Sequence, residues 1–296
     1  MNNFIQRIRT FAKNFLWLRK FVAYRLAPSG LFDSFFTNYR VDAGWQNRID
    51  IVLSCPDNDK IKSVPNAGSI QHGKQLMHNG LLVNLGSYYG PEVSVMLKKN
   101  RGIHEPQEEL AFDIVLPFLP KGATMIEMGS FWAFYSMCFN KRIENAQNYL
   151  IEPDAFNLES GKRNFRLNKM HGQFFQYFIS DTSGTVIDNA ETIAIDDFVQ
   201  MNQIKFVDML HSDIQGFESD MLRGAANLFK SEKVGYVFIS THSNEIHTAC
   251  LNQLKEYGYM ILCEANMDQS YSLDGLIVAK HPAYPGPNFI DISHRS

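Results

Sequence analysis

The chain has 296 residues, 45% of them hydrophobic and 20% charged, so it can bury a sizeable core. A formal net charge of -3 gives no reason to expect nucleic acid as a partner. The four cysteines form no CxxC pair, which favours reduced thiols in a cytoplasmic protein over a zinc site or a disulfide scaffold. No apolar run is long enough to span a membrane.

Residues 1–30 are predicted to contain a basic amphipathic helix. Apolar residues recur there at helical spacing, and no acidic residue precedes Asp33. The apolar positions are Phe4, Ile8, Phe11, Phe15, Leu18 and Val22. Two interpretations stay open: peripheral contact of residues 1–26 with an anionic membrane or a partner, or packing on the protein's own domain with a solvated basic face.

Residues 31–100 are predicted to form a β-rich N-terminal extension. The runs 49–53 and 81–85 are strand-like, and prolines and glycines interrupt the sequence between them. The segment carries no catalytic motif. We expect it to cover one end of the domain that follows and to shape a substrate pocket.

From residue 101 to residue 296, strands alternate with helices. The expected strands are 124–128, 149–151, 174–179, 206–211, 234–240, 259–263 and 275–279. The expected helices are 106–119, 135–142, 154–168, 217–229 and 244–257. This alternation predicts an α/β fold with a mostly parallel seven-stranded sheet, helices on both faces and an antiparallel edge formed by the closing strand pair.

Ligands of such a sheet bind beyond the carboxyl ends of the strands. Gly129 follows the first strand and lets the backbone pass close to a ligand. Glu152 follows the second strand, roughly 20 residues later, a spacing at which an acid accepts hydrogen bonds from a nucleotide ribose. Alternatively Glu152 caps the next helix, a role that Asp154 can take instead. The GxGxxG pattern is incomplete, which disfavours a dinucleotide.

Several motifs occur in the order typical of one family. They are the acidic-x-Gly loop at 127–136, the second-strand acid at Glu152-Pro153, the Ser-Asp-x-x-Gly stretch at 180–184, and a pattern at 195–198 and 207–218 similar to TLDD…IDFIKIDVEGAE. Over residues 101–280 the chain therefore resembles the FkbM family of S-adenosylmethionine-dependent methyltransferases. It departs from the family pattern at Glu127 (usually Asp), Phe131 (usually Asn) and Ala133 (usually a second Gly).

The resemblance implies a Rossmann-like class I methyltransferase with S-adenosyl-L-methionine as its cofactor. The family-like contacts are Glu127, Gly129 and Ser130 at the methionine portion, Glu152 at the ribose, and Ser180 and Asp181 at the adenine. Glu105 precedes a helix aimed at the first-strand loop and is a candidate for the cofactor's amino group. For Asp181, a turn begun with Gly184 is the alternative.

His211, Asp213 and His242 stand at the ends of the fourth and fifth strands, where they are expected to converge beside the transferred methyl group. An alcohol acceptor must lose a proton, so we expect His242 as general base and Asp213 as the carboxylate that orients the acceptor. In the alternatives, His242 braces a loop, or Asp213 with a histidine holds a divalent metal for which the spacing supplies no third ligand.

The predicted enzyme methylates a hydroxyl of a sugar or glycan precursor, which the family resemblance implies. N-methylation of a small molecule is the first alternative, because an amine acceptor needs a weaker base. The second is a non-catalytic module that binds S-adenosylmethionine and presents the N-terminal helix to a membrane. The altered loop at Glu127 motivates this second alternative.

Overall fold

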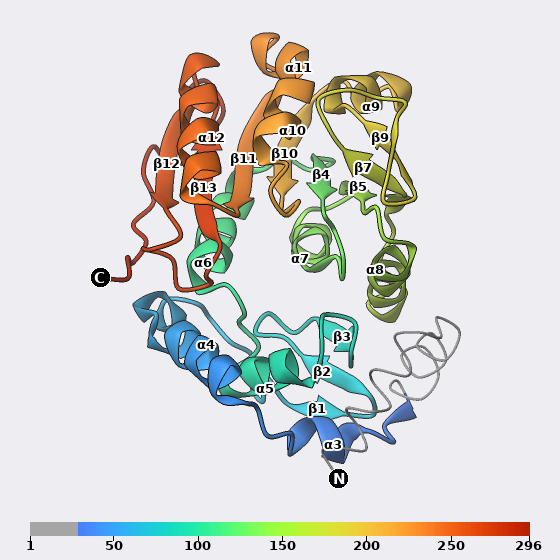
Figure 1. Cartoon of the computed structure of the whole chain (residues 1–296), viewed down its shortest axis with the longest axis vertical. Coiled ribbons are helices and arrows are strands. Elements are labelled where there is room, and N and C mark those ends of the chain that lie inside the picture. The colour runs from blue at the N-terminus through green and yellow to red at the C-terminus, as the bar shows by residue number, and fades with distance from the viewer. Residues whose placement is uncertain (1–28) are drawn as a thin grey trace.

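The computed structural model describes residues 29–296, and its main sheet has seven strands in the order β12-β13-β11-β10-β4-β5-β6 (Figure 1). The strands are β4 (Thr124–Met128), β5 (Gln147–Ile151), β6 (Gln173–Phe175), β10 (Val207–Ser212), β11 (Val234–Thr241), β12 (Met260–Ala265) and β13 (Gly275–Lys280). Neighbouring strands are parallel, except that β13 runs antiparallel to both β11 and β12. The predicted α/β fold and mostly parallel sheet are confirmed.

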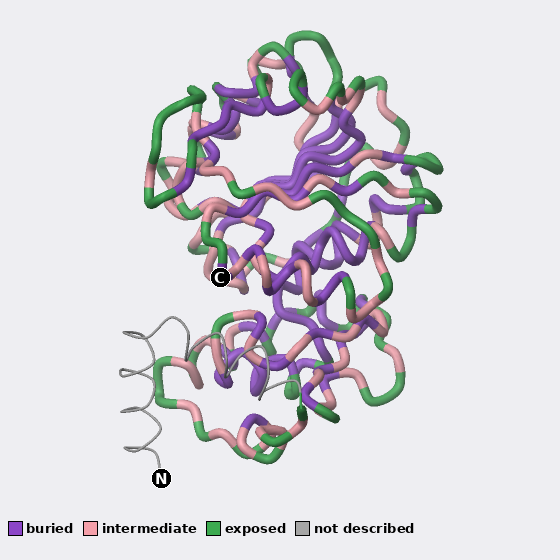
Figure 2. The backbone as a smooth tube through the Cα atoms, turned by 90° about the vertical axis from the view of Figure 1, so that its right-hand side faces the viewer, coloured by how far each residue is buried: buried purple, intermediate pink, exposed green. Residues whose placement is uncertain are grey.

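Helices cover both faces of this sheet. One face is packed by α6 (Pro106–Val115), α7 (Phe134–Arg142) and α8 (Ala155–Leu167), and the other by α9 (Ile195–Met201), α10 (Glu218–Gly224), α11 (Ala226–Lys230) and α12 (Asn244–Glu256). Successive strand residues point to opposite faces: Met125 and Met209 join the first core, and Ile126 and Leu210 join the second. The strands are therefore buried on both sides, as the purple segments of Figure 2 show.

Local signals in the sequence explain where helices begin. The Asp154 side chain accepts hydrogen bonds from the N–H groups of Phe156 and Asn157 and caps α8. Ser243 caps α12 in the same way, through the N–H of Ile246. Pro106 occupies the first turn of α6, where a missing N–H costs nothing.

The N-terminal extension contains more helix than predicted. Its elements are α3 (Asp33–Thr37), α4 (Ala43–Ser54), a 3-10 turn η3 (Pro56–Asp59), a three-stranded sheet of β1 (Ile70–Gln71), β2 (Lys74–Leu76) and β3 (Leu82–Asn84), and α5 (Pro91–Lys99). The strand at 81–85 is confirmed as β3. The strand at 49–53 is wrong: Asp42 caps α4, and Ile49 and Val52, three residues apart, face the core from one side of that helix.

The extension and the sheet domain share one hydrophobic core. Ile49, Met77 and Val83 of the extension belong to the same buried cluster as Phe112 of α6 and Phe139 of α7. The residues after β13 tie the two parts further: Ser293 donates from its backbone N–H and its hydroxyl to Asp57, and its carbonyl accepts from Gln107. The boundary between extension and domain at residue 100 therefore stays a proposal.

Two predicted elements are each divided in two. Instead of one strand at 174–179, β6 ends at Phe175 and β7 (Tyr177–Ile179) joins a separate small sheet with β8 (Val186–Ile187) and β9 (Ala190–Ile193). Instead of one helix at 217–229, α10 and α11 follow each other. The Asp196 carboxylate accepts from the N–H groups of Asn227 and Leu228, which starts α11 as a new helix.

The predicted basic helix falls in residues 1–28 and lies outside the described residues. Within residues 29–296, no helix combines the length and apolar character needed to cross a bilayer. The four cysteines are all buried and free.

Candidate active site

Strands β4 and β10 lie side by side at the point where the strand order reverses, and their carboxyl ends meet there. Asp213 N donates to Met128 O at 3.0 Å. Gly129 adopts φ +72°, and a Cβ at this position would stand 1.7 Å from the carbonyl oxygen of Asp213. Gly129 is thus required for the close passage of these two strand ends.

The loop from Gly129 into α7 is strained where the chain departs from the family pattern. Ala133 adopts φ +65° at the N-cap of α7, a left-handed conformation that favours glycine, the residue of the family pattern. Phe131 is also left-handed, with φ +38°. The Ser130 hydroxyl is buried and has no hydrogen-bond partner among the described residues. A buried hydroxyl without a partner fits a site for a polar ligand.

Glu152 lies buried at the end of β5, beside this loop. Its two carboxylate oxygens accept from Phe131 N (3.1 Å) and Asp154 N (3.0 Å). Asn157 Nδ2 donates weakly to the same oxygen as Asp154 N, at 3.5 Å. Because a carboxylate can accept about four hydrogen bonds, Oε2 can still accept from a ribose hydroxyl. Burial raises the pKa of Glu152 to about 7. The alternative that Glu152 caps α8 is wrong, because Asp154 does so.

Glu127 turns toward the start of α7. Its Oε2 accepts from Ser136 N at 3.1 Å. This oxygen therefore stabilises the start of the helix and is not free to bind a ligand. Burial raises the pKa of Glu127 to about 7.

Glu105 stands at the N-cap of α6 and reaches α7. Its Oε2 accepts from the Tyr135 hydroxyl at 2.8 Å and lies 3.0 Å from Nε2 of His104. Burial opposes ionisation of Glu105, but the charge and hydrogen bond of His104 lower its pKa. Glu105 is therefore an ionised carboxylate beside the helix that follows the first-strand loop.

Ser180 and Asp181 lie at the end of β7 and pack near α10. Ser180 Oγ donates to Asp181 Oδ1 at 3.4 Å, and the other Asp181 oxygen lies 3.6 Å from Nε of Arg223. Gly184 N donates to Thr192 O instead of closing a turn on Asp181. The adenine role of this pair stays a proposal.

Asp213 and His242 come together, as expected from their positions at neighbouring strand ends. His242 Nε2 lies 3.2 Å from Asp213 Oδ1, and Nδ1 lies 2.7 Å from Oε1 of the fully buried Glu218. Burial alone would lower the pKa of His242, but the hydrogen bonds to Asp213 and Glu218 raise it to about 10. The two carboxylates thus favour the cationic form of His242 at neutral pH.

His211 pairs with Glu108 of α6 and not with His242. Its Nε2 lies 2.7 Å from Oε1 of Glu108 on α6, and Ser240 Oγ donates to the other oxygen of Glu108 at 3.0 Å. Burial raises the pKa of Glu108, and the contact with Glu108 raises that of His211. Burial opposes the charge of His211, so the hydrogen bond with Glu108 is what favours its cationic form.

Sequence reasoning missed Asp274, the residue before β13. Its Oδ1 lies 3.8 Å from Nε2 of His242, and burial raises its pKa to about 6. Its neighbour Gly275 pairs with Thr241, so the start of the antiparallel β13 lies at the carboxyl end of β11. That antiparallel arrangement is the signal that could have identified Asp274. Glu108 and Tyr135 were also missed.

The extension contributes aromatic rings to the same region. Tyr88 stacks on Trp132 with ring centroids 4.4 Å apart and an interplanar angle of 13°, and its edge meets Phe131 at 5.2 Å. Tyr89 is exposed. Burial raises the pKa of Tyr89, and the charges of Asp213 and Asp274 raise it further. In residues 29–296, no three His, Cys, Asp or Glu side chains are grouped to hold a metal ion.

Solved structures with a similar fold include precorrin-6y C5,15-methyltransferase from Geobacter metallireducens GS-15, at 12% identity and TM-score 0.39 over 57% of this chain and 86% of that one. A SAM dependent methyltransferase from Aquifex aeolicus is 11% identical, at TM-score 0.39 over 60% of this chain and 90% of that one. TrmK of M. capricolum, in complex with S-adenosyl-homocysteine, is 13% identical, at TM-score 0.39 over 59% of this chain and 69% of that one. No curated protein matches the sequence.

Residues 113–261 match the family model described as the methyltransferase FkbM domain. The match covers half of the chain and spans the strand ends that carry Gly129, Glu152, Asp213 and His242. Glu105 and Asp274 lie outside it. The chain belongs to the FkbM methyltransferase family and is an S-adenosylmethionine-dependent methyltransferase.

Proposed function

We propose that this enzyme methylates a hydroxyl group of a sugar or glycan precursor. The observation that carries the proposal is the pair of carboxylates, Asp213 and Asp274, at 3.2 and 3.8 Å from Nε2 of His242. Both side chains are partly exposed, at 28%. Two reachable carboxylates can accept hydrogen bonds from neighbouring hydroxyls of one acceptor, whereas nucleic acid would be repelled by them.

The cofactor contacts are part of the proposal. Glu152 would accept from a ribose hydroxyl, Ser130 would line the methionine portion, and the ionised Glu105 would hold the amino group. Ser180 and Asp181 would bind the adenine. When bound, S-adenosylmethionine supplies a methyl group that is already electrophilic, so the chain's own residues have to align the acceptor, exclude water and take its proton.

The base role shifts from His242 to Asp274. A histidine that is cationic at neutral pH cannot take a proton, whereas a carboxylate with a pKa of about 6 is ionised at pH 7 and more basic than an ordinary aspartate. Asp274 would thus take the proton of the acceptor hydroxyl. Asp213, held by His242, would orient that hydroxyl.

The aromatic side chains suit a sugar on the acceptor side. Tyr89 is exposed within electrostatic reach of the two carboxylates, and its ring contacts those of Tyr88 and Phe131. An aromatic face covers the apolar C–H groups of a sugar ring while the carboxylates bind its hydroxyls. In this proposal the extension shapes the acceptor pocket, and the four free thiols suit a cytoplasmic location.

The test combines cofactor binding with product analysis. Isothermal titration should first show S-adenosylmethionine binding to the full chain. Sugar nucleotides and glycan precursors are then incubated with cofactor labelled in the methyl group. We expect label in a methyl ether, which survives mild alkali and appears on a monosaccharide after acid hydrolysis. Label in a methylamine would instead establish N-methylation, and absence of cofactor binding would end the proposal.

A further inference from the structure

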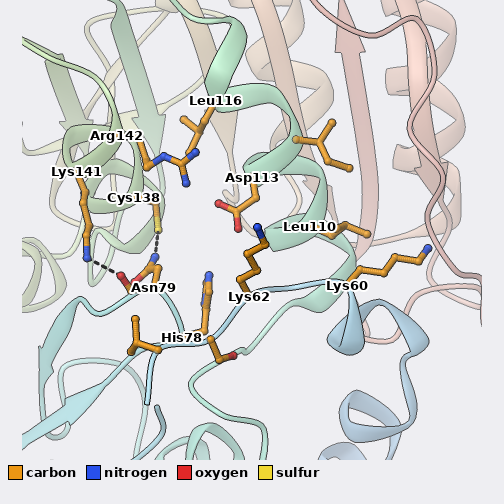
Figure 3. A pocket seen from close by; sticks show the side chains of 13 residues that line it. Lys60, Lys62, His78, Asn79, Leu110, Asp113, Leu116, Cys138, Lys141 and Arg142 are labelled. Atoms are coloured by element: carbon orange, nitrogen blue, oxygen red, sulfur yellow. Dashed lines mark hydrogen bonds between the residues drawn. The ribbon is translucent and has the colours of Figure 1, made fainter. Parts of the chain in front are cut away.

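A hollow of about 490 Å³ lies between the extension and the sheet domain (Figure 3). It is lined by Lys60, Lys62, Ser63, Val64, His78 and Asn79 of the extension, and by residues of α6, of the 3-10 turn η4 (Leu116–Phe118) and of α7. Glu105 and Tyr135 stand at the N-terminal ends of α6 and α7. Asp113, Lys141 and Arg142 line the hollow from the C-terminal ends of the same helices. The hollow is thus separate from the methyl-transfer site.

The basic side chains of the hollow fall into two groups. Lys60 is already neutralised, at 2.9 Å from Asp57 and 3.5 Å from Asp291, and Lys141 Nζ donates to the carbonyl of Asn79. Lys62 and Arg142, in contrast, form no ion pair with any other of residues 29–296. Figure 3 shows these two side chains entering the hollow from opposite sides, Lys62 from the extension and Arg142 from the end of α7.

One carboxylate, Asp113, faces the two uncommitted cations. Burial raises the pKa of Asp113, whereas the charges of His78 and Arg142 lower it, so Arg142 is within electrostatic reach of this side chain. One negative charge cannot balance Lys62, Lys141 and Arg142 together. The hollow therefore keeps an excess of positive charge, which attracts an anion.

Part of the remaining wall is apolar. Val64, Leu110, Ile114 and Leu116 line the hollow together with the buried Cys138. A cavity of this volume accommodates a small organic molecule, since ligand pockets measure about 300–1,000 Å³. It is larger than a bare inorganic anion needs. Its ligand should therefore combine an anionic group with a carbon framework.

We propose that this hollow binds a small phosphorylated metabolite, such as a sugar phosphate, with the phosphate between Lys62 and Arg142. The planar guanidinium of Arg142 can bind two phosphate oxygens at once, and the ammonium of Lys62 adds a point charge. A phosphate carries close to two negative charges at pH 7, which suits two cations better than a carboxylate does. The Asp113 carboxylate can accept a hydrogen bond from a sugar hydroxyl.

The test is titration calorimetry on the full chain with ribose 5-phosphate, inorganic pyrophosphate and ribose. We expect both phosphates to bind and ribose to give no heat. Lys62→Gln and Arg142→Gln should each weaken ribose 5-phosphate at least fivefold, and 0.5 M salt should weaken it as well. The matched control Lys230→Gln, on the exposed end of α11, should leave the affinity unchanged.

Two further measurements keep the result interpretable. Each variant is checked for an unchanged melting temperature and unchanged S-adenosylmethionine affinity, because neither Lys62 nor Arg142 belongs to the proposed cofactor site. Vesicles that contain phosphatidic acid test whether a lipid headgroup is the source of the phosphate. Equal affinity for ribose and ribose 5-phosphate, equal affinity in all variants, or binding to vesicles alone would overturn the proposal.

Discussion

His104 Nδ1 lies 2.6 Å from Oε1 of Glu109, and both side chains are almost completely buried. The contact is the centre of a row of alternating charges. Glu109 Oε2 also lies 2.8 Å from Nδ1 of His78, and His104 Nε2 lies 3.0 Å from Glu105. Since His78 lines the basic hollow and Glu105 belongs to the candidate active site, this buried row connects the two regions.

Glu109→Gln should strongly destabilise the protein. The substitution removes the carboxylate that pairs with His78 and one of the two that pair with His104, and breaking a buried ion pair on one side costs about 3–5 kcal/mol. Urea denaturation followed by circular dichroism measures the loss. Glu144→Gln, at an exposed pair with Lys121, is the control and should change the unfolding free energy by less than about 1 kcal/mol. Equal effects of the two substitutions would show that the row does not stabilise the fold.

The stability of the protein should fall on the alkaline side. Burial opposes the charge of His104, but Glu105 and Glu109 raise its pKa to about 10. A raised histidine pKa stabilises the folded state fully below the unfolded value of about 6.5, and this contribution is lost as pH rises toward 10. Denaturation midpoints measured from pH 6 to pH 10 should therefore decline, and decline less in His104→Gln. Parallel curves for the two proteins would contradict the assignment.

Glu152→Gln should weaken S-adenosylmethionine binding by about 10-fold. The change keeps the size of the side chain but replaces one acceptor oxygen by a donor, which costs about 1–3 kcal/mol at a buried site. Titration calorimetry gives the affinity. Glu159→Gln, on the exposed side of α8, is the matched control. Our placement of the ribose is incorrect if both variants bind the cofactor like the natural protein.

Asp274→Asn should lower kcat by about 100-fold and leave cofactor affinity within twofold, because the residue acts on the acceptor proton. The pH profile of kcat/KM in the natural enzyme should rise with an apparent pKa of about 6, and the variant should lose this limb. Asp268→Asn, in the same connection between β12 and β13, serves as the control. If the kcat/KM profile of Asp274→Asn still rises with the same apparent pKa, another residue is the general base.

Gly129→Ala should destabilise the protein by about 2–5 kcal/mol, because the added methyl group would collide with the backbone of Asp213 in a left-handed conformation. Gly184→Ala separates the steric clash from the cost of the left-handed backbone conformation. Gly184 has φ +89° but open space around its Cβ position, so only the conformational cost of about 1–2 kcal/mol should appear. Thermal unfolding of both variants provides the comparison; a similar loss in both would exclude the steric contribution.

The fold was predictable where a strand is a short apolar run with clear ends. β4 occupies 124–128 as expected, because Gly122 precedes this run and Gly129 follows it. The error at 49–53 has a different origin. β-branched residues at Ile49, Ile51 and Val52 suggest a strand, yet Ile49 and Val52 are also spaced for one helical face, and Asp42 begins the helix.

The sequence predicts which residues of the candidate site lie close together, but not the charge or the hydrogen-bond partners of their side chains. Strand ends indicate that Asp213 and His242 converge, since parallel strands end at the same edge. The charge of His242 depends on Asp213 and also on Glu218, which comes from a helix and is buried beside it, so tertiary packing contributes to this charge. His211 also stands near the end of a strand, but its side chain pairs with Glu108 of α6 instead.

The position of β13 between β11 and β12 has a consequence for biosynthesis. β13 is the last strand of the sheet to leave the ribosome, yet it fills the gap between two strands made earlier. Until then, β11 presents an open row of backbone donors and acceptors to other nascent chains. A polypeptide stopped before Gly275 would therefore be expected to aggregate during expression, even though every proposed cofactor contact would already have been synthesised.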